Sequence, residues 1–399
     1  MVDTIRYKNT LLIKEIMEEC GISSPRRVFK LTNESISLFR LDLSGLTVLT
    51  EAANWYYNLT PIIAALSGAE KVFAITRDSR FATAEKVEKE LNLLSNTVDV
   101  RDNIKLITKK TPEVISQADI ITNLGFVRPI DKWMIHFLKG TAVIPLMFET
   151  WEFRKEDIDL GACREKGIPV LGTNEKVKEI DMFKYSGPLC LKHILDMDLE
   201  IIDCKFVVRG GGVFGANIIR TLSALGAEVW AVCSESPEEV KKLGANKAGN
   251  NLKEQETRID IKDAEALIVV SFPDENIIVG DNGEITAEDL LALSEGISVI
   301  QFFGEIDRTS LDRVGIPYTP NRDPGKGHMA LTMADLGPKQ MIKLNTASLR
   351  VGEIMCRARL DGCSRREAEE RAIEEGLGQD FSIEQKIELG LLERGEINE

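Results

Sequence analysis

The sequence predicts an α/β protein of two domains, each built on a parallel sheet covered by helices. At 399 residues the chain exceeds one ordinary compact core, so two domains of roughly 150 to 200 residues each are expected. Short apolar runs alternate with helical segments along most of the chain, which is typical of parallel sheets. A glycine-rich turn near residue 210 joins a strand directly to a helix and marks the more specific domain.

The composition is that of a folded, acidic globular protein. Apolar residues make up 43% and charged residues 29%, and the formal net charge is −14 with a pI near 5.0. Such a surface repels phosphate backbones and anionic membranes, so neither a nucleic acid nor a membrane is expected as a partner. The seven cysteines include no C-x-x-C pair, which favours reduced thiols and a cytoplasmic location. No export signal is recognised, which agrees with the expected cytoplasmic location. No group of His, Cys or Asp residues has the spacing of a zinc site, so no metal is expected.

The N-terminal domain is expected to span residues 1–185 and to be a flavodoxin-like α/β substrate domain. It opens with helical sequence to about residue 37, and a helical return over 336–362 completes it. A helix face is predicted at 62–66. Apolar runs of strand type occur at 48–49, 72–75, 105–107, 120–121, 142–147 and 168–171.

The second domain is expected over residues 186–335. It begins with a helix at about 187–200 and ends in a glycine-rich loop from residue 321 onward. The elements predicted between them are strands at 206–208, 229–232, 266–270 and 298–302 and a helix at 216–225. Residues 363–399 are predicted to form a helical C-terminal extension, because Ser364 and Glu367 have capping-box spacing. This extension is interpreted as a solvated tail or a subunit contact.

Gly210, Gly212 and Gly215 form a G-x-G-x-x-G motif between an apolar strand and a helix. The first glycine permits the tight turn, the second lets the backbone approach a pyrophosphate, and the third lets the helix pack on the strand. The amides at the helix N-terminus then face the phosphates. The motif therefore predicts a Rossmann dinucleotide-binding domain, with Val213 and Phe214 in the same cofactor-binding turn.

The turn after the second strand of this domain bears on the choice between NAD and NADP. An acid that binds the ribose is expected about 18 residues after the third glycine, where the chain has Cys233. Glu235 lies two residues further and reaches the ribose if the turn is longer. Ser234, with Lys241 nearby, would instead accommodate a 2′-phosphate. NAD is therefore favoured, and NADP stays open.

Four segments of the chain resemble the adenosylhomocysteinase family, within the superfamily that includes the D-2-hydroxyacid and formate dehydrogenases. The most specific likeness is the seven-residue step from an asparagine to a Gly-His pair. The four segments are 58–87, 173–187, 301–311 with Glu305, Ile306 and Asp307, and 321–340 with Asn321, Gly327, His328, Met333 and Gln340.

The resemblance implies roles for particular residues. In the family, the asparagine contacts the nicotinamide carboxamide and the histidine sits at the substrate, which places these roles on Asn321 and His328. It also implies a homo-oligomer, either a dimer or a tetramer. The family's catalytic lysine and the asparagine of its hinge segment fall on Asp181 and Lys184, so the hydrolase residues are substituted. Asp181 and Lys184 are either a new acid and base or an exposed ion pair.

Hydride transfer from a C–H that bears an OH or NH₂ needs a base beside the nicotinamide. His328 is the best candidate, because it lies in a glycine-rich loop at the expected domain junction. The other two histidines, His136 and His193, lie in helical patterns and are interpreted as structural.

Substrate contacts are expected from both domains, around the cleft between them. Arg322 and Lys326 are candidates to hold an anionic group, and Arg308 is an alternative to Arg322. Asn54, which matches a nucleoside-contacting region of the family, and Glu149, near the expected cleft wall, are the candidates in the first domain.

These features predict an NAD(P)-dependent oxidoreductase that acts on a small polar hydroxy or amino compound. Two alternatives stay open. One is a hydrolase or lyase that keeps NAD bound and oxidises its substrate transiently, and the other is an NAD-binding regulator without turnover.

Overall fold

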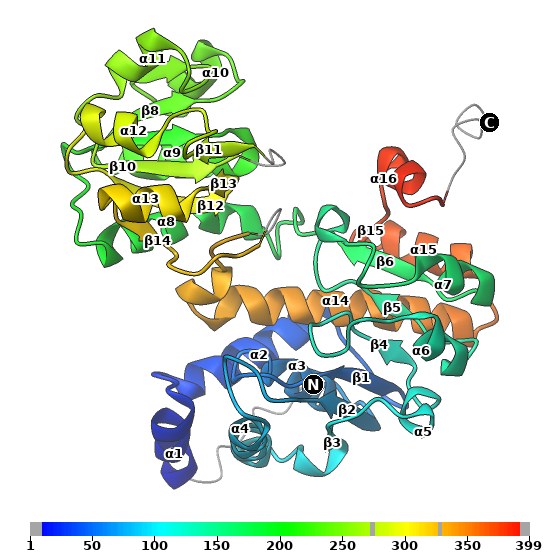
Figure 1. Ribbon diagram of the computed structural model, residues 1–399. Helices are drawn as coiled ribbons and strands as arrows, with labels where there is room; N and C mark the ends of the chain where they lie inside the picture. Colours follow the sequence, from blue (N-terminus) through cyan, green and yellow to red (C-terminus); the bar gives the residue numbers. More distant parts are fainter. Residues whose placement is uncertain (1–9, 272–275, 326–328, 392–399) are drawn as a thin grey trace. The chain divides into compact units, whose positions relative to one another are not determined.

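The structure is a computed structural model that describes residues 10–271, 276–325 and 329–391. The chain forms two compact units, which are drawn in Figure 1. Unit 1 comprises Met1–Ile180 and Pro338–Glu399, and unit 2 comprises Asp181–Gly337. Within the described residues, none of the helices is long and apolar enough to cross a membrane.

Unit 1 is built on a parallel sheet with the strand order β3-β2-β1-β4. A bridge between Ile120 and Val143 continues it to β5 and β6, and β15 adds an antiparallel edge. Along the chain the full order β3-β2-β1-β4-β5-β6 is 3-2-1-4-5-6, the doubly wound Rossmann order, and without the edge strand β3 it becomes the flavodoxin-like order 2-1-3-4-5. The strands are β1 (Thr47–Glu51), β2 (Lys71–Ile75), β3 (Ile104–Ile107), β4 (Ile120–Ile121), β5 (Ile144–Pro145), β6 (Val170–Thr173) and β15 (Gly378–Gln379).

Helices cover both faces of this sheet. Successive strand residues point to opposite sides, and here the residues of both sides are apolar and need to be buried. Val48 packs in one apolar core with α2, α3 and α14, whereas Leu49 packs in another with α6 and α7. The helices of unit 1 are α1 (Thr10–Cys20), α2 (Pro25–Phe39), α3 (Leu59–Leu66), α4 (Ala84–Thr97), α5 (Pro112–Ile115), α6 (Lys132–Phe137), α7 (Leu160–Lys166), α14 (Pro338–Leu360), α15 (Arg365–Glu374) and α16 (Ile383–Glu388), with 3-10 turns η1 (Arg101–Asn103) and η2 (Thr150–Glu152).

The long helix α14, drawn in orange in Figure 1, packs along α2, α3 and the strands β4 to β6. Gly352 lets it approach the sheet, because a Cβ there would lie 2.9 Å from both Ile120 Cγ2 and Pro145 Cγ. The described part of the predicted C-terminal extension also belongs to unit 1. Its helix α15 packs on α14, and β15 pairs with β6.

Unit 2 contains a parallel sheet with the order β14-β12-β10-β7-β8-β9, which is the Rossmann order 3-2-1-4-5-6. Its strands are β7 (Lys205–Arg209), β8 (Glu228–Val232), β9 (Lys247–Gly249), β10 (Ala266–Val270), β12 (Ser298–Phe303) and β14 (Tyr318–Thr319), and β11 (Ile277–Val279) pairs separately with β13 (Glu305–Ile306). Its helices are α8 (Ser186–Asp196), α9 (Gly212–Ala224), α10 (Pro237–Lys242), α11 (Gln255–Asp260), α12 (Ala287–Leu293) and α13 (Arg308–Val314), with 3-10 turns η3 (Met182–Tyr185) and η4 (Met333–Leu336).

The predicted fold class is confirmed, since two parallel-sheet α/β units and a helical C-terminal region are present. Several elements differ in extent, and two of these differences have a clear local cause. The run 142–147 contributes only the short strand β5, in which Pro145 has no N–H to donate. The helix predicted at 216–225 begins earlier, at Gly212, because the end of the glycine turn forms its first turn.

Candidate functional site

The glycine motif lies where the spacing predicts it, between the end of β7 and the start of α9. Gly210 has φ +115°, and a Cβ there would lie 2.5 Å from the carbonyl carbon and oxygen of Val270. A Cβ on Gly215 would lie 2.7 Å from the Gly210 carbonyl oxygen. Both positions therefore require glycine, the first for its backbone conformation and the second for the contact between helix and strand.

Glu235 lies directly against this turn. Its Oε1 accepts a hydrogen bond from the backbone N–H of Gly212 at 2.5 Å. A Cβ on Gly211 would lie 2.0 Å from Oε2 of the same carboxylate. The longer turn that the sequence left open is therefore present, and it brings the acid back to the loop.

The carboxyl group of Glu235 is ionised more readily than usual. Partial burial opposes ionisation, but the Gly212 amide, the Cys233 thiol and the Glu235 amide outweigh it and lower the pKa. The Oε2 atom is buried and has no hydrogen-bond partner among the described residues. A ribose hydroxyl would supply the donor that this oxygen lacks.

The neighbouring serines differ in what they offer a ligand. Ser234 is exposed. Ser236 caps α10, where its hydroxyl accepts from the Glu239 N–H and the Glu239 carboxylate accepts from the Ser236 N–H. Lys241 is exposed in the last turn of the same helix. The Glu239 N–H at the start of α10 therefore already has a hydrogen-bond partner within the protein.

Val213 and Phe214 have different surroundings. Val213 is 45% exposed. Phe214 is buried and packs against Phe183 and Phe303, with ring centres 5.2 Å and 5.1 Å apart. The Phe214 side chain therefore contributes to packing, and only its backbone is left to contact a cofactor.

The loop after β14 carries two of the predicted site residues. Asn321 and Arg322 are both exposed there, two and three residues beyond the end of the strand. His328 and Lys326, which the sequence predicts in the same loop, lie outside the described residues.

Asp181 and Lys184 form an ion pair at the start of unit 2. The distance from Lys184 Nζ to Asp181 Oδ2 is 3.2 Å, and the two side chains are 47% and 39% exposed. Asp181 has φ +40°, in the left-handed region. The geometry is that of the exposed ion pair, one of the two interpretations of the sequence.

The carboxyl ends of the unit 1 strands carry buried polar residues that the sequence did not single out. Glu51 ends β1 and is 4% exposed, and its Oε2 accepts from the Phe126 N–H at 2.7 Å. Burial raises its pKa to about 7, although this amide and two arginines lower it. Asn123, just beyond β4, is fully buried, with Oδ1 accepting from the Met147 N–H and Nδ2 without a partner among the described residues.

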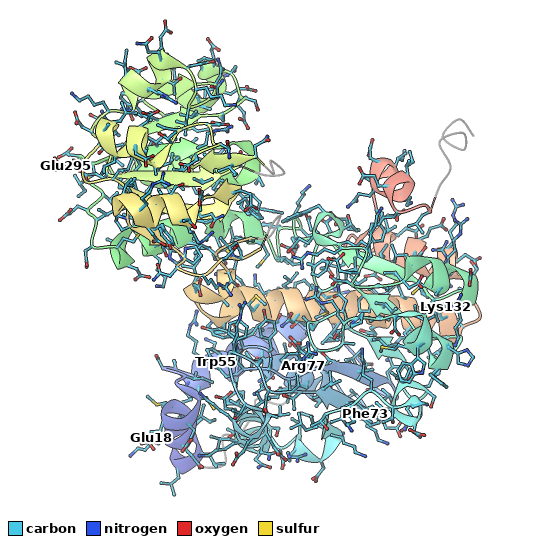
Figure 2. All side chains as sticks on the ribbon, in the orientation of Figure 1. Glu18, Trp55, Phe73, Arg77, Lys132 and Glu295 are labelled. Carbon is cyan, nitrogen blue, oxygen red and sulfur yellow. The ribbon has the colours of Figure 1, made fainter. Side chains whose placement is uncertain are left out.

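These two residues belong to one place in the fold. Leu49 pairs with Ile121 across β1 and β4, and Glu51 and Asn123 each lie two residues further, at the carboxyl ends of these adjacent strands. The order of strands reverses between β1 and β4, and ligands of doubly wound sheets bind at such points. Trp55 and Arg77, which follow β1 and β2, are labelled on the side where these strands end in Figure 2.

Glu149 lies beyond β5 in a group of three carboxyl groups. It is 1% exposed, and it accepts from Trp151 Nε1 at 2.8 Å and from the Glu175 N–H at 3.2 Å. Burial and the neighbouring carboxyl groups raise the pKa of Glu152 to about 7 and that of Glu175 well above its ordinary value. Some of these groups are therefore protonated near neutral pH.

Asn54, the other substrate candidate of unit 1, is engaged locally. Its Oδ1 accepts from the backbone N–H groups of Tyr56 and Tyr57 at 3.1 Å and 3.4 Å. As for metals, no group of three or more His, Cys, Asp or Glu in the described parts of the chain is arranged to hold an ion.

Comparison with solved structures identifies similar folds. A dipicolinate synthase subunit from Bacillus halodurans aligns at 16% identity over 77% of this chain and 97% of that chain, with a TM-score of 0.50. The corresponding dipicolinate synthase chain from Bacillus subtilis aligns at 14% identity over 80% and 99%, with a TM-score of 0.51. The likeness is one of fold. An NAD-complexed D-isomer specific 2-hydroxyacid dehydrogenase from Lactobacillus delbrueckii ssp. bulgaricus aligns at 13% identity over 79% and 98%, with a TM-score of 0.40.

The sequence itself matches no protein-family model and no curated protein. The likeness to the two dipicolinate synthase structures shows the fold alone. The finer resemblance to adenosylhomocysteinase stays a prediction.

Proposed function

We propose that this protein is an NAD-dependent oxidoreductase that acts on a small polar hydroxy or amino compound. The observation that carries the proposal is the Glu235 carboxylate held on the Gly212 amide, at the turn of a sheet with the Rossmann strand order. This arrangement combines a turn that admits a pyrophosphate with an acid that accepts hydrogen bonds from a ribose. NAD, when bound, supplies a hydride acceptor for the substrate carbon.

The same carboxylate favours NAD over NADP. A 2′-phosphate on the same ribose would lie close to the ionised Glu235 carboxylate, and the two negative charges would repel each other. The turn offers the exposed Ser234 hydroxyl in compensation, whereas Ser236 is already bonded to Glu239. Lys241 is exposed in the last turn of α10, whereas the Glu235 carboxylate is hydrogen-bonded to the glycine turn itself, so we assign NAD as the cofactor.

The residues around the reacting carbon follow from the resemblance to adenosylhomocysteinase. We assign His328 as the acid and base, Asn321 as the residue that orients the nicotinamide carboxamide, and Arg322 or Lys326 as the contact to an anionic substrate group. Asn54 and Glu149 are the proposed substrate contacts in unit 1, and the buried Glu51 joins them because it ends the strand at the reversal of the sheet order.

A redox assay with a panel of small hydroxy, keto and amino compounds tests this function, with the reduced nicotinamide followed by its absorbance. For any compound turned over, His328→Gln should lower kcat by about 10²-fold or more, because loss of a general base typically costs that much. His136→Gln, on α6 of unit 1, is the control and should keep the parent rate. Undiminished turnover by His328→Gln would remove the proposed acid and base.

A further inference from the structure

The loop after β14 lies on one particular half of the unit 2 sheet. In a sheet of this order the two halves bind the two ends of a dinucleotide, and the division falls between β7 and β10. The glycine turn and Glu235 belong to the half formed by β7, β8 and β9. The loop that carries Asn321 belongs to the other half, which receives the nicotinamide end.

Arg308 is the first residue of α13, and its side chain hydrogen-bonds the backbone of this loop. Its Nη2 donates to the carbonyl oxygen of Arg322 at 3.0 Å and to that of Pro320 at 3.5 Å. Its guanidinium carbon lies 5.6 Å from the centre of the Tyr318 ring, in the strand before the loop. Within the described chain, no other side chain from elsewhere hydrogen-bonds residues 320–323.

The guanidinium is itself fixed by the sheet. Nη2 of Arg308 also donates to Oε1 of Gln301 at 2.6 Å. Gln301 belongs to β12 and is 1% exposed, and its Nε2 donates to the Gly304 carbonyl at 2.6 Å. The orientation of the Gln301 amide is therefore set, and the arginine is anchored to a central strand.

The positive charge of Arg308 has little compensation from negatively charged side chains. Its side chain is 15% exposed, and its one ion pair in the described structure, with Asp323, spans 4.0 Å. Its Nε is buried without a hydrogen-bond partner among the described residues. Burying a cation mainly against carbonyl groups gains little stability. The planar, many-donor guanidinium does offer a rigid way to fix several acceptors at once.

We propose that Arg308 is a positioning residue, which fixes Pro320 and Arg322 on either side of Asn321 and so presents the Asn321 carboxamide to the nicotinamide end of the dinucleotide. Asn321 itself is exposed, so its place depends on the backbone that Arg308 holds. This inference rests on the proposed NAD function. It adds a residue that strengthens binding of the nicotinamide end through Asn321 and makes no contact with the cofactor itself.

Two probes separate the ends of the cofactor. NADH carries the nicotinamide, and ADP-ribose lacks it, so calorimetric titration of the full chain with each compares the two halves of the site. Arg308→Gln should weaken NADH binding about tenfold, equivalent to about 1.4 kcal/mol, and change ADP-ribose binding by less than about twofold. Arg308→Lys should show the same pattern, because lysine keeps the charge and loses the planar group that directs the Nη2 hydrogens to Gln301, Pro320 and Arg322.

The control is Arg313→Gln on the same helix. Arg313 is 49% exposed and pairs with Asp281 and Glu288, away from the loop. Its replacement should leave both affinities unchanged. Retained binding of ADP-ribose by Arg308→Gln shows at the same time that the variant is folded.

A double-mutant cycle with Asn321→Ala completes the test. If Arg308 acts through Asn321, the double variant binds NADH no more weakly than the weaker single variant. Equal loss of NADH and ADP-ribose in Arg308→Gln, additive losses in the cycle, or no loss at all would each overturn the positioning role. A parent protein that binds neither probe would instead overturn the proposed function itself.

Discussion

The Glu235 carboxylate accepts a hydrogen bond from the Gly212 amide at 2.5 Å, although 23 residues separate the two in the chain. The contact joins the turn after β8 to the first turn of α9. It places an acid beside the backbone that approaches a pyrophosphate in Rossmann domains. The consequences for cofactor choice can be measured directly.

Replacement of Glu235 should weaken the preference for NADH over NADPH. A hydrogen bond to a charged group contributes about 1.5 to 3 kcal/mol, so Glu235→Ser should lose roughly tenfold or more in NADH affinity. NADPH binding should improve or stay unchanged, because the repulsion is removed. Paired fluorescence titrations check this, with the exposed Glu238→Gln on α10 as control. An unchanged ratio of the two affinities would contradict the ribose role.

Gly215→Ala should damage both the fold of unit 2 and its nucleotide binding. The new Cβ would meet the Gly210 carbonyl oxygen at 2.7 Å and push α9 away from β7. Such overpacking costs about 1 to 3 kcal/mol. Gly296→Ala is the matched control, because no atom lies within 4 Å of the position that its new methyl group would take. Denaturant unfolding of both variants, followed by fluorescence, should show the loss for Gly215→Ala alone.

Glu51 should make the stability of unit 1 depend on pH. Its pKa is about 7 in the folded chain against an ordinary 4.5, so the folded form keeps a proton that the unfolded chain releases. The stabilising effect is complete below pH 4.5 and is lost as the pH rises to about 7. The total is about 3 kcal/mol at 1.36 kcal/mol per pKa unit.

Glu51→Gln removes this titration and keeps an oxygen that accepts from the Phe126 amide. Relative to the parent, the variant should therefore gain stability between about pH 5 and 7, as measured by chemical denaturation at several pH values. Glu70→Gln, at an exposed position before β2, should follow the parent curve. Parallel curves for the parent and Glu51→Gln would show that Glu51 is not protonated in the folded chain.

Gly352→Ala should destabilise unit 1, although alanine is the better helix former. The added methyl would lie 2.9 Å from Ile120 Cγ2 and Pro145 Cγ, between α14 and the sheet. Overpacking of about 1 to 3 kcal/mol outweighs the gain of about 1 kcal/mol in helix propensity. Gly140→Ala meets open space and should be neutral. A thermal midpoint raised by Gly352→Ala would contradict this packing.

Local patterns explain what the sequence could predict. The strand, glycine turn and helix from Lys205 to Ala224 are encoded in consecutive residues, so spacing alone predicts them. The place of Glu235 depends on the length of a turn, which spacing does not determine. The sequence therefore pointed to the residue and left its role open until the fold showed the Gly212 contact.

Non-local pairing explains what the sequence could not predict. Glu51 and Asn123 lie at the carboxyl ends of adjacent strands only because β1 pairs with β4, a pairing that joins residues about 70 positions apart in the chain. A polar residue directly after an apolar strand was the one local signal available. The clamp of Arg308 on the loop after β14 depends likewise on the parallel pairing of β12 with β14. His328 and Lys326 remain predictions, because they lie outside the described residues.

Calorimetric titration with NADH tests most directly whether the glycine turn of unit 2 binds the dinucleotide. The parent should bind one NADH per chain and bind NADPH at least about tenfold more weakly. Gly212→Val should bind neither, because no protein atom lies within 4 Å of its Cβ and the side chain occupies the space through which the pyrophosphate approaches, while its circular dichroism stays that of a folded α/β protein. Failure of the parent to bind either nucleotide, or full binding by Gly212→Val, would contradict the dinucleotide site.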